Sequence, residues 1–149
     1  MNIYQLLRIS WLKAGIGVNE GATQADVDRF EKKHHISLPI SFKEYLLAVN
    51  GMKAGETDEH LVSFLSLQAI DQEPNYSEIS GNRIEIAIAE FSVYCHLYVL
   101  RASRDGECSP VFATDGKHDK QVASSFDEFV DKYLSNPVNV VHCWTQANH

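Results

Sequence analysis

The sequence lacks the long hydrophobic run and the basic leader that would direct a chain into or across a membrane. No run approaches the roughly 18 apolar residues that a membrane-spanning helix needs. The first residues, MNIYQLLRISWLKAG, have no basic start, and their apolar positions recur at helical spacing, which is untypical of a signal peptide. The three cysteines, Cys95, Cys108 and Cys143, form an odd, widely spaced set that suits reduced thiols better than a disulfide framework. We therefore expect a cytoplasmic protein.

Motifs of metal, cofactor and covalent chemistry are also missing. The chain has neither C-x-x-C nor H-x-x-x-H, and the adjacent His34 and His35 would point in different directions on a helix, so no metal site is expected. It contains no G-x-S-x-G elbow, no G-x-G-x-x-G loop and no Walker sequence. Cys95 and His96 would face opposite sides of a strand, with Cys95 in the core. We expect no catalytic residue, no cofactor and no enzyme activity.

Basic residues are scarce in one part of a chain whose formal net charge is −7. Between residues 52 and 82, Lys53 is the single Lys or Arg. The same stretch holds six acidic residues: Glu56, Asp58, Glu59, Asp71, Glu73 and Glu78. Binding to nucleic acid depends on Lys and Arg that neutralise phosphates, so we expect neither DNA nor RNA as a ligand. The acidic residues would complement a basic partner, or they serve only to keep the protein soluble.

Three helices are predicted before residue 52. Apolar residues at helical spacing predict a first helix over 3–14. Thr23 and Asp26 have the spacing of a capping box that begins a second helix. Pro39 opens a third one, because the N–H groups of a first turn have no intrahelical partner. Asn50-Gly51 predicts a left-handed cap at its end.

The remaining residues predict a sheet followed by a helix. Strands are expected at 61–68, 83–89, 92–102, 110–114 and 121–123, with a turn-rich connection over 72–82. A last helix begins after Ser125 and stops at Asn136-Pro137. This order indicates an α+β fold with N-terminal helices, a largely antiparallel or mixed sheet of about five or six strands, and a C-terminal helix packed on the sheet. At 149 residues the chain fits a single domain.

Two segments resemble a known family. GATQADVDRFEKKHHISLPISFKEYLLAVNG (21–51) resembles the opening signature of the SUKH superfamily, and VASSFDEFVDKYLSNP (122–137) resembles its closing strand and helix. The superfamily includes bacterial immunity proteins against polymorphic toxins and a fungal regulator of cell-wall synthesis. The resemblance implies one SUKH-like domain over 1–149 with a core at about 20–137. The tail of uncertain structure, 138–149, holds Val138, Val140, Val141 and Trp144, which would pack on the domain or on another subunit. Residues 89–92 depart from the family, which often has a turn with Gly or Asp before its long strand.

The resemblance implies an immunity protein that binds a cognate bacterial toxin, often a nuclease, and blocks its functional surface. The six acidic residues would then occupy or screen the basic surface with which the toxin binds nucleic acid. Alternatively, the partner docks on an exposed sheet face, where Tyr94, His96 and Tyr98 recur at strand spacing; core packing under a helix explains that spacing equally well. The fungal branch implies a second function, a non-enzymatic regulatory or scaffold domain. A third alternative is an enzyme or small-molecule binder whose pocket the sequence does not reveal.

Overall fold

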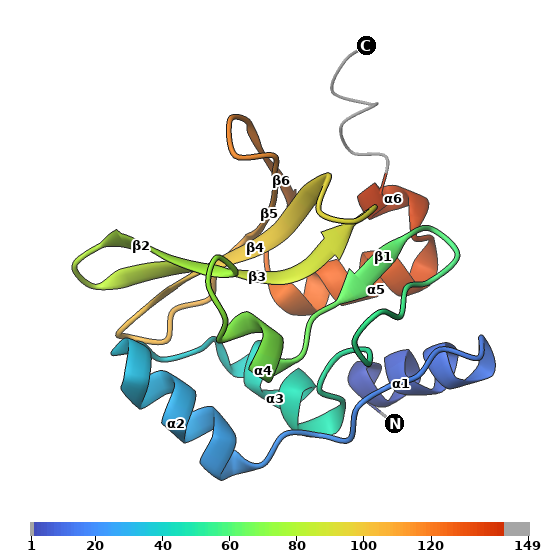
Figure 1. Ribbon diagram of the computed structural model, residues 1–149, viewed down its shortest axis with the longest axis horizontal. Coiled ribbons are helices and arrows are strands. Elements are labelled where there is room, and N and C mark those ends of the chain that lie inside the picture. The colour runs from blue at the N-terminus through green and yellow to red at the C-terminus, as the bar shows by residue number, and fades with distance from the viewer. Residues whose placement is uncertain (1, 142–149) are drawn as a thin grey trace.

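Helices and strands follow one another along the chain in the order of an α+β fold (Figure 1). The computed structural model describes residues 2–141. Its helices are α1 (Ile3–Lys13), α2 (Gln24–His34), α3 (Ile40–Ala48), α4 (Leu67–Ile70), α5 (Phe126–Ser135) and α6 (Val138–Val141). Its strands are β1 (Val62–Phe64), β2 (Tyr76–Ser80), β3 (Arg83–Phe91), β4 (His96–Ser103), β5 (Val111–Thr114) and β6 (Asp119–Ala123). The predicted fold class is confirmed.

The strands pair into one antiparallel sheet in the order β1-β3-β4-β5-β6, and β2 also pairs with β3. Tyr76 of β2 lies opposite Ile86 near the start of β3, whereas Val62 of β1 lies opposite Phe91 at its end. The prediction of a turn-rich connection over 72–82 is wrong for residues 76–80. Most side chains of β2 are exposed, so no hydrophobic alternation reveals the strand, and its pairing with β3 is what forms it.

Local capping accounts for where α2 begins, but the predicted cap does not account for where α3 ends. Thr23 and Asp26 make both hydrogen bonds of the predicted capping box. Helix α3 ends at Ala48, earlier than expected, and the residue after it is extended, so Asn50-Gly51 is not its cap. The Asn50 side chain instead accepts the Leu67 N–H at 2.7 Å, at the start of α4. Gly51 has φ +69°, and a Cβ there would lie 2.6 Å from the carbonyl of Leu65.

The core lies between the helices and one face of the sheet. The ring of Phe129 in α5 lies 6.0 Å from that of Phe64 in β1 and 5.2 Å from that of Tyr98 in β4. Helices α1 and α3 pack beside α5 on this side (Figure 1). Val140 and Val141 of α6 are buried, so this part of the tail packs on the domain. Trp144 lies outside the described residues.

The strand predicted over 92–102 begins four residues later, at His96. Residues 92–95 form a tight turn between β3 and β4, in which Ser92, Val93 and Tyr94 all have positive φ. Cys95 is exposed in this turn, so its expected place in the core is wrong.

Candidate functional site

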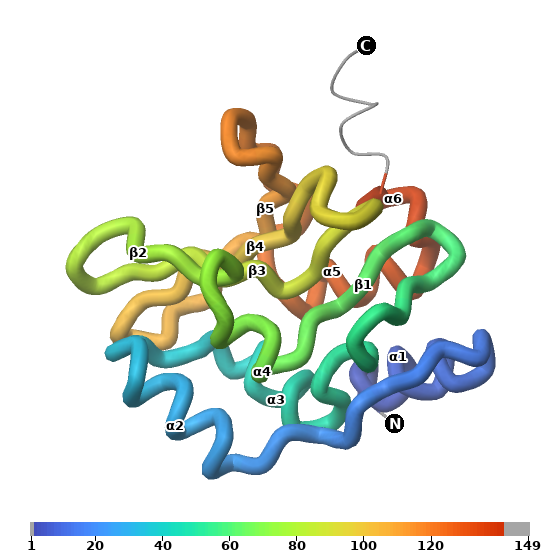
Figure 2. Tube along the Cα trace, in the orientation of Figure 1, coloured from blue at the N-terminus to red at the C-terminus, as the bar shows by residue number. Residues whose placement is uncertain are grey.

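Two loops meet at one end of β1 and β3 and present apolar side chains to solvent. They are residues 58–61, before β1, and residues 92–95, after β3, and together they form the paired-loop surface (Figure 2). The Ser92 N–H donates to the Leu61 carbonyl at 2.9 Å, which joins the loops. Leu61 is 50% exposed, Val93 86% and Tyr94 54%. Large exposed apolar side chains gathered in this way are typical of protein interaction sites.

The backbone of the paired-loop surface adopts conformations that non-glycine residues rarely take. Among residues 2–141, five residues other than glycine have positive φ, and four of them are Leu61, Ser92, Val93 and Tyr94. Each such residue carries strain of about 1–3 kcal/mol, which persists only where surrounding contacts impose it. Here the nearly buried Glu90 carboxylate accepts the Tyr94 N–H at 2.6 Å. This contact imposes a turn where residues 89–92 contain no turn-forming residue.

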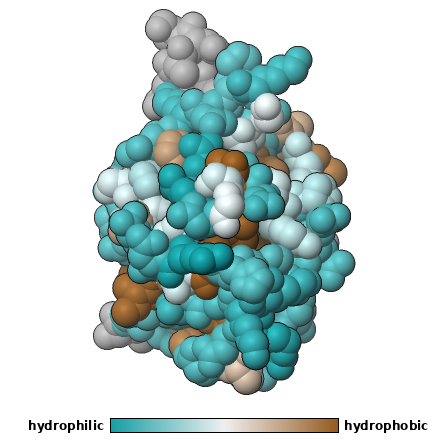
Figure 3. Space-filling model, turned by 90° about the vertical axis from the view of Figure 1, so that its left-hand side faces the viewer, coloured by the Kyte–Doolittle hydropathy of each residue, from teal (hydrophilic) through white to brown (hydrophobic). Residues whose placement is uncertain are grey.

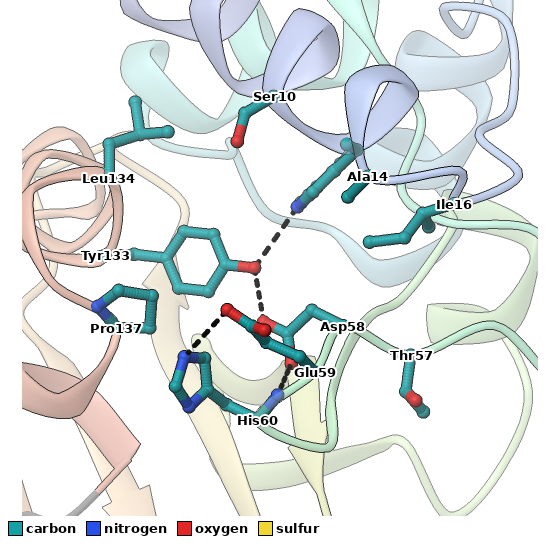
Figure 4. Close-up of a pocket in the computed structure, with 11 residues that line it drawn as sticks. Ser10, Ala14, Ile16, Thr57, Asp58, Glu59, His60, Tyr133, Leu134 and Pro137 are labelled. Atoms are coloured by element: carbon teal, nitrogen blue, oxygen red, sulfur yellow. Dashed lines mark hydrogen bonds and ion pairs between the residues drawn. The ribbon is translucent and has the colours of Figure 1, made fainter.

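A chain of hydrogen bonds ties loop 58–61 to α1 and α5 (Figure 4). The Trp11 Nε1–H donates to the Tyr133 hydroxyl at 3.2 Å, and this hydroxyl donates to Oδ2 of Asp58. Oδ1 of Asp58 accepts the N–H groups of His60 at 2.8 Å and Val62 at 2.9 Å. Burial raises the pKa of the Tyr133 phenol, and the Asp58 carboxylate raises it further. Asp58 is therefore a structural anchor of the loop.

The same residues border a cavity of about 520 Å³ between α1, α5 and loop 57–60. Asp58 points toward Tyr133, and Glu59 points toward His60, whose Nε2 lies 3.5 Å from Oε1 of Glu59 (Figure 4). The Glu59 side chain is 88% exposed. The residues that line the cavity are Ser10, Trp11, Ala14, Ile16, Thr57, Asp58, Glu59, His60, Tyr133, Leu134 and Pro137. They include two carboxylates and no Lys or Arg.

A second cavity, of about 350 Å³, adjoins the same loop region, and Thr57 lines both cavities. It is bordered by residues 52–57, by β1 and by Val93 and Tyr94 of the paired-loop surface. Glu56 lines it and accepts the Gly17 N–H at 3.1 Å. Glu56, Asp58, Glu59 and Tyr94, four of the nine predicted site residues, thus belong to one region of the molecule.

The other three predicted acidic residues lie elsewhere. Oδ1 of Asp71, just after α4, lies 3.0 Å from Nζ of Lys33 and 2.8 Å from Nε2 of His34. Burial raises the pKa of the Asp71 carboxyl, but the hydrogen bonds from His34 and Lys33 outweigh it, and the pKa lies below its ordinary value. Glu73 and Glu78 are exposed.

The surface around Glu78 is mixed in charge. Glu78 borders a cleft between α2 and the β2–β3 hairpin together with Lys33, Arg83 and Arg104. Hydrophilic side chains prevail on this side of the molecule, with only scattered apolar ones (Figure 3). The structure therefore does not gather the six predicted acidic residues into one acidic face.

Of the three residues predicted at strand spacing, Tyr94 alone is exposed. His96 is 6% exposed and Tyr98 0%, and the Tyr98 hydroxyl donates to the Val140 carbonyl at 3.0 Å. An exposed docking face at His96 and Tyr98 is therefore wrong, and core packing, the alternative, holds. The reason is register, because His96 and Tyr98 lie on the same face of β4, and on that face Tyr98 contacts α5 and α6. Burial also lowers the pKa of the His96 imidazole, although the charge of Asp115 opposes this.

Sequence reasoning missed Leu61, Val93 and Glu90. Leu61 and Val93 are apolar residues next to strands, and nothing local distinguishes an exposed one from a buried one. The one indication in the sequence was that residues 89–92 lack the Gly or Asp of the family's usual turn. This indicated an unusual connection before the long strand but did not predict its backbone conformation. In the part of the chain that the structure describes, no three His, Cys, Asp or Glu side chains are placed to hold a metal. No helix in that part is long and apolar enough to span a membrane.

Comparison with known proteins places most of the chain in one family. Residues 21–132 match the SMI1 / KNR4 family (SUKH-1). An uncharacterised protein of Bacillus subtilis (strain 168), YobM, is 25% identical in an alignment of 121 residues that covers 76% of this chain. The chain spans 65% of the length of that relative. The family match contains α2 to β6 and most of α5, and so includes both loops of the paired-loop surface.

Proposed function

Because the chain belongs to the SMI1 / KNR4 family (SUKH-1), we propose that it is an immunity protein that binds and neutralises a cognate bacterial toxin. The family match over residues 21–132 is the observation that carries this proposal. The toxin is of the nuclease type, and the chain acts in the cytoplasm, where it blocks the functional surface of the toxin. In this proposal the chain works by binding alone and makes or breaks no covalent bond.

The paired-loop surface supports a protein partner. Interface centres are apolar and rich in aromatic residues, and the residues around them exclude water. Leu61, Val93 and Tyr94 provide such a centre, and the exposed Glu59 lies beside it. A nuclease presents a basic surface to its substrate, so an acidic residue here would raise the rate of association. The strained turn holds Val93 and Tyr94 in place before binding, which lowers the entropy lost on association.

A growth competition tests the proposal while the toxin is still unidentified. The gene is deleted in the organism that encodes it, and the deletion strain is grown in contact with its parent. We expect the parent to inhibit the deletion strain, because the parent still makes the toxin, and we expect the intact chain to restore resistance. Equal growth of the two strains in contact would contradict the proposal. A growth or envelope defect of the deletion strain grown alone would instead indicate the regulatory function of the fungal branch.

The same assay tests the surface. Val93→Asp places a charge at the apolar centre, and Asp tolerates positive φ better than Val, so the fold should be retained. We expect this variant to lose protection. Ile79→Asp is the matched control, because Ile79 is an exposed apolar residue of β2, far from the paired-loop surface. Full protection by Val93→Asp, or equal loss in both variants, would exclude the surface assignment.

A further inference from the structure

The cavity between α1, α5 and loop 57–60 combines an acidic side with an apolar wall. Asp58 and Glu59 provide the carboxylates, while Ile16, Leu134 and Pro137 provide apolar surface. No Lys or Arg is among its lining residues, and His60 is the basic neighbour of Glu59. At about 520 Å³ the cavity is in the size range of ligand sites, about 300–1,000 Å³, and exceeds what one long side chain needs.

The hydrogen bonds around Asp58 leave it able to bind one more donor. A carboxylate has about four lone-pair positions. Two N–H groups and the Tyr133 hydroxyl occupy three positions of Asp58. The fourth, on Oδ2, remains, and the oxygens of Glu59 are largely in solvent. The loop thus presents two adjacent carboxylates, Asp58 held by its hydrogen bonds and Glu59 reaching into solvent, which suits a guanidinium or ammonium group more than a neutral one.

We propose that this cavity receives a cationic side chain, an arginine or a lysine, from the partner toxin. This inference rests on the proposed function and names the chemistry by which that partner is recognised. The cation bonds to Asp58 and Glu59, and its aliphatic stem packs on Ile16 and Leu134, because long cationic side chains bury their stems against apolar surface. Leu61 and Val93 of the paired-loop surface contact the apolar residues around that cation.

The cation binds weakly in the open cavity, and the position beside the paired-loop surface strengthens this ion pair in the complex. An ion pair in open solvent contributes little, about 0–1 kcal/mol. Once the partner covers Leu61, Val93 and Tyr94, water is excluded around the cavity mouth and the attraction between the charges increases. Specificity follows as well, because a partner without the cation would leave Asp58 and Glu59 desolvated and unpaired.

The test uses the full chain labelled with ¹⁵N and capped tripeptides Gly-X-Gly, where X is arginine, lysine, citrulline or glutamate. Citrulline has nearly the shape of arginine and no charge. The reporters are the backbone amides of His60 and Val62, which bond to Asp58, and the Trp11 indole N–H, which bonds to the Tyr133 hydroxyl. We expect saturable shifts of these signals with the arginine or lysine peptide and none with the citrulline or glutamate peptide. The relative affinities of the first two distinguish a guanidinium site from an ammonium site.

Two variants sharpen the measurement. Glu59→Gln removes one exposed charge and preserves shape, and we expect it to weaken peptide binding by about fivefold, the upper end for such a pair. Glu73→Gln changes an exposed acidic residue outside the cavity and should leave binding unchanged. Equal shifts with citrulline, unaltered binding to Glu59→Gln, or no saturable shift up to the solubility limit of the peptides would each overturn the inference.

The two proposals fail in different ways. If the arginine or lysine peptide binds as expected but the deletion strain competes equally with its parent, the immunity function is wrong and the cavity site stands. If the deletion strain is inhibited, Glu59→Gln protects it fully and no peptide binds, the immunity function stands and the cavity site is wrong.

Discussion

Replacing Asp58 by alanine should destabilise the protein far more than the same change at its neighbour Glu59. Asp58→Ala removes the acceptor of two backbone N–H groups and of the Tyr133 hydroxyl. Tyr133 is 4% exposed, so its hydroxyl would keep the bond from Trp11 but lose the group to which it donates. Glu59 is 88% exposed, and its Oε1 lies 3.5 Å from Nε2 of His60.

The expected loss in the free energy of unfolding depends on how far each hydrogen bond is shielded from water. A hydrogen bond to a charged group contributes about 1.5–3 kcal/mol. Tyr133 is almost fully buried, and its bond should contribute in this range. The N–H of the half-buried His60 recovers much of its loss from water, whereas the N–H of Val62, which is 0% exposed, recovers less. We expect a total loss of about 2–4 kcal/mol, a large part of the 5–15 kcal/mol that stabilises a typical domain. Glu59→Ala should change stability by no more than about 0.5 kcal/mol.

Urea denaturation measures the difference. At an m value of about 2 kcal/mol per molar urea, a loss of 3 kcal/mol lowers the midpoint by roughly 1.5 M. A double-mutant cycle of Asp58→Asn and Tyr133→Phe should give a coupling energy of about 1 kcal/mol or more. An Asp58→Ala midpoint equal to that of Glu59→Ala, or additive effects in the cycle, would refute the anchor. A confirmed anchor would make Glu59 the informative residue for binding, since changes at Asp58 alter folding as well.

Two further predictions concern the close backbone approach at Gly51 and the ionisation of two buried tyrosines. Gly51→Ala places a Cβ 2.6 Å from the Leu65 carbonyl at φ +69°, so we expect a loss of about 2–4 kcal/mol in urea denaturation. Gly55→Ala is the control, with positive φ but nothing within 4 Å, and should lose only about 1–2 kcal/mol; equal losses would exclude the close approach. Burial raises the pKa of the Tyr45 and Tyr133 phenols, so the folded state retains the neutral form. Stability should therefore be full below the ordinary pKa of about 10 and decline as the pH rises above it, and constant stability from about pH 8 to pH 11 would contradict this burial.

The helix starts were predictable because their signals are local. The capping box of Thr23 and Asp26 and the Ser125 cap lie within four residues of the groups that they satisfy. The apolar stripe of α5 likewise needs only the helical period to be recognised. The register of β4 was different, because Val93 and Tyr94 look like strand residues, and the turn that contains them depends on Glu90. The strand was predicted to begin four residues too early. Its alternation was correct, but the face assigned to solvent, with His96 and Tyr98, is buried.

The acidic residues show the same limit. Their number in residues 52–82 was plain in the sequence, but their roles depend on neighbours far along the chain. Asp58 bonds to Tyr133, 75 residues away, and Asp71 bonds to His34, 37 residues away. Glu59, Glu73 and Glu78 are all exposed, but of these three only Glu59 lies beside the paired-loop surface.

The α+β class and the positions of the capped helices could be predicted from the amino acids, since they depend on composition, period and spacing between near neighbours. The family was expected from the resemblance of residues 21–51 and 122–137 to its motifs. Long-range contacts were needed to establish which acidic residues are exposed, where β4 begins, and that loops 58–61 and 92–95 form one surface. Such features join residues far apart in the chain, and a strained turn exists only where these contacts outweigh its local preference.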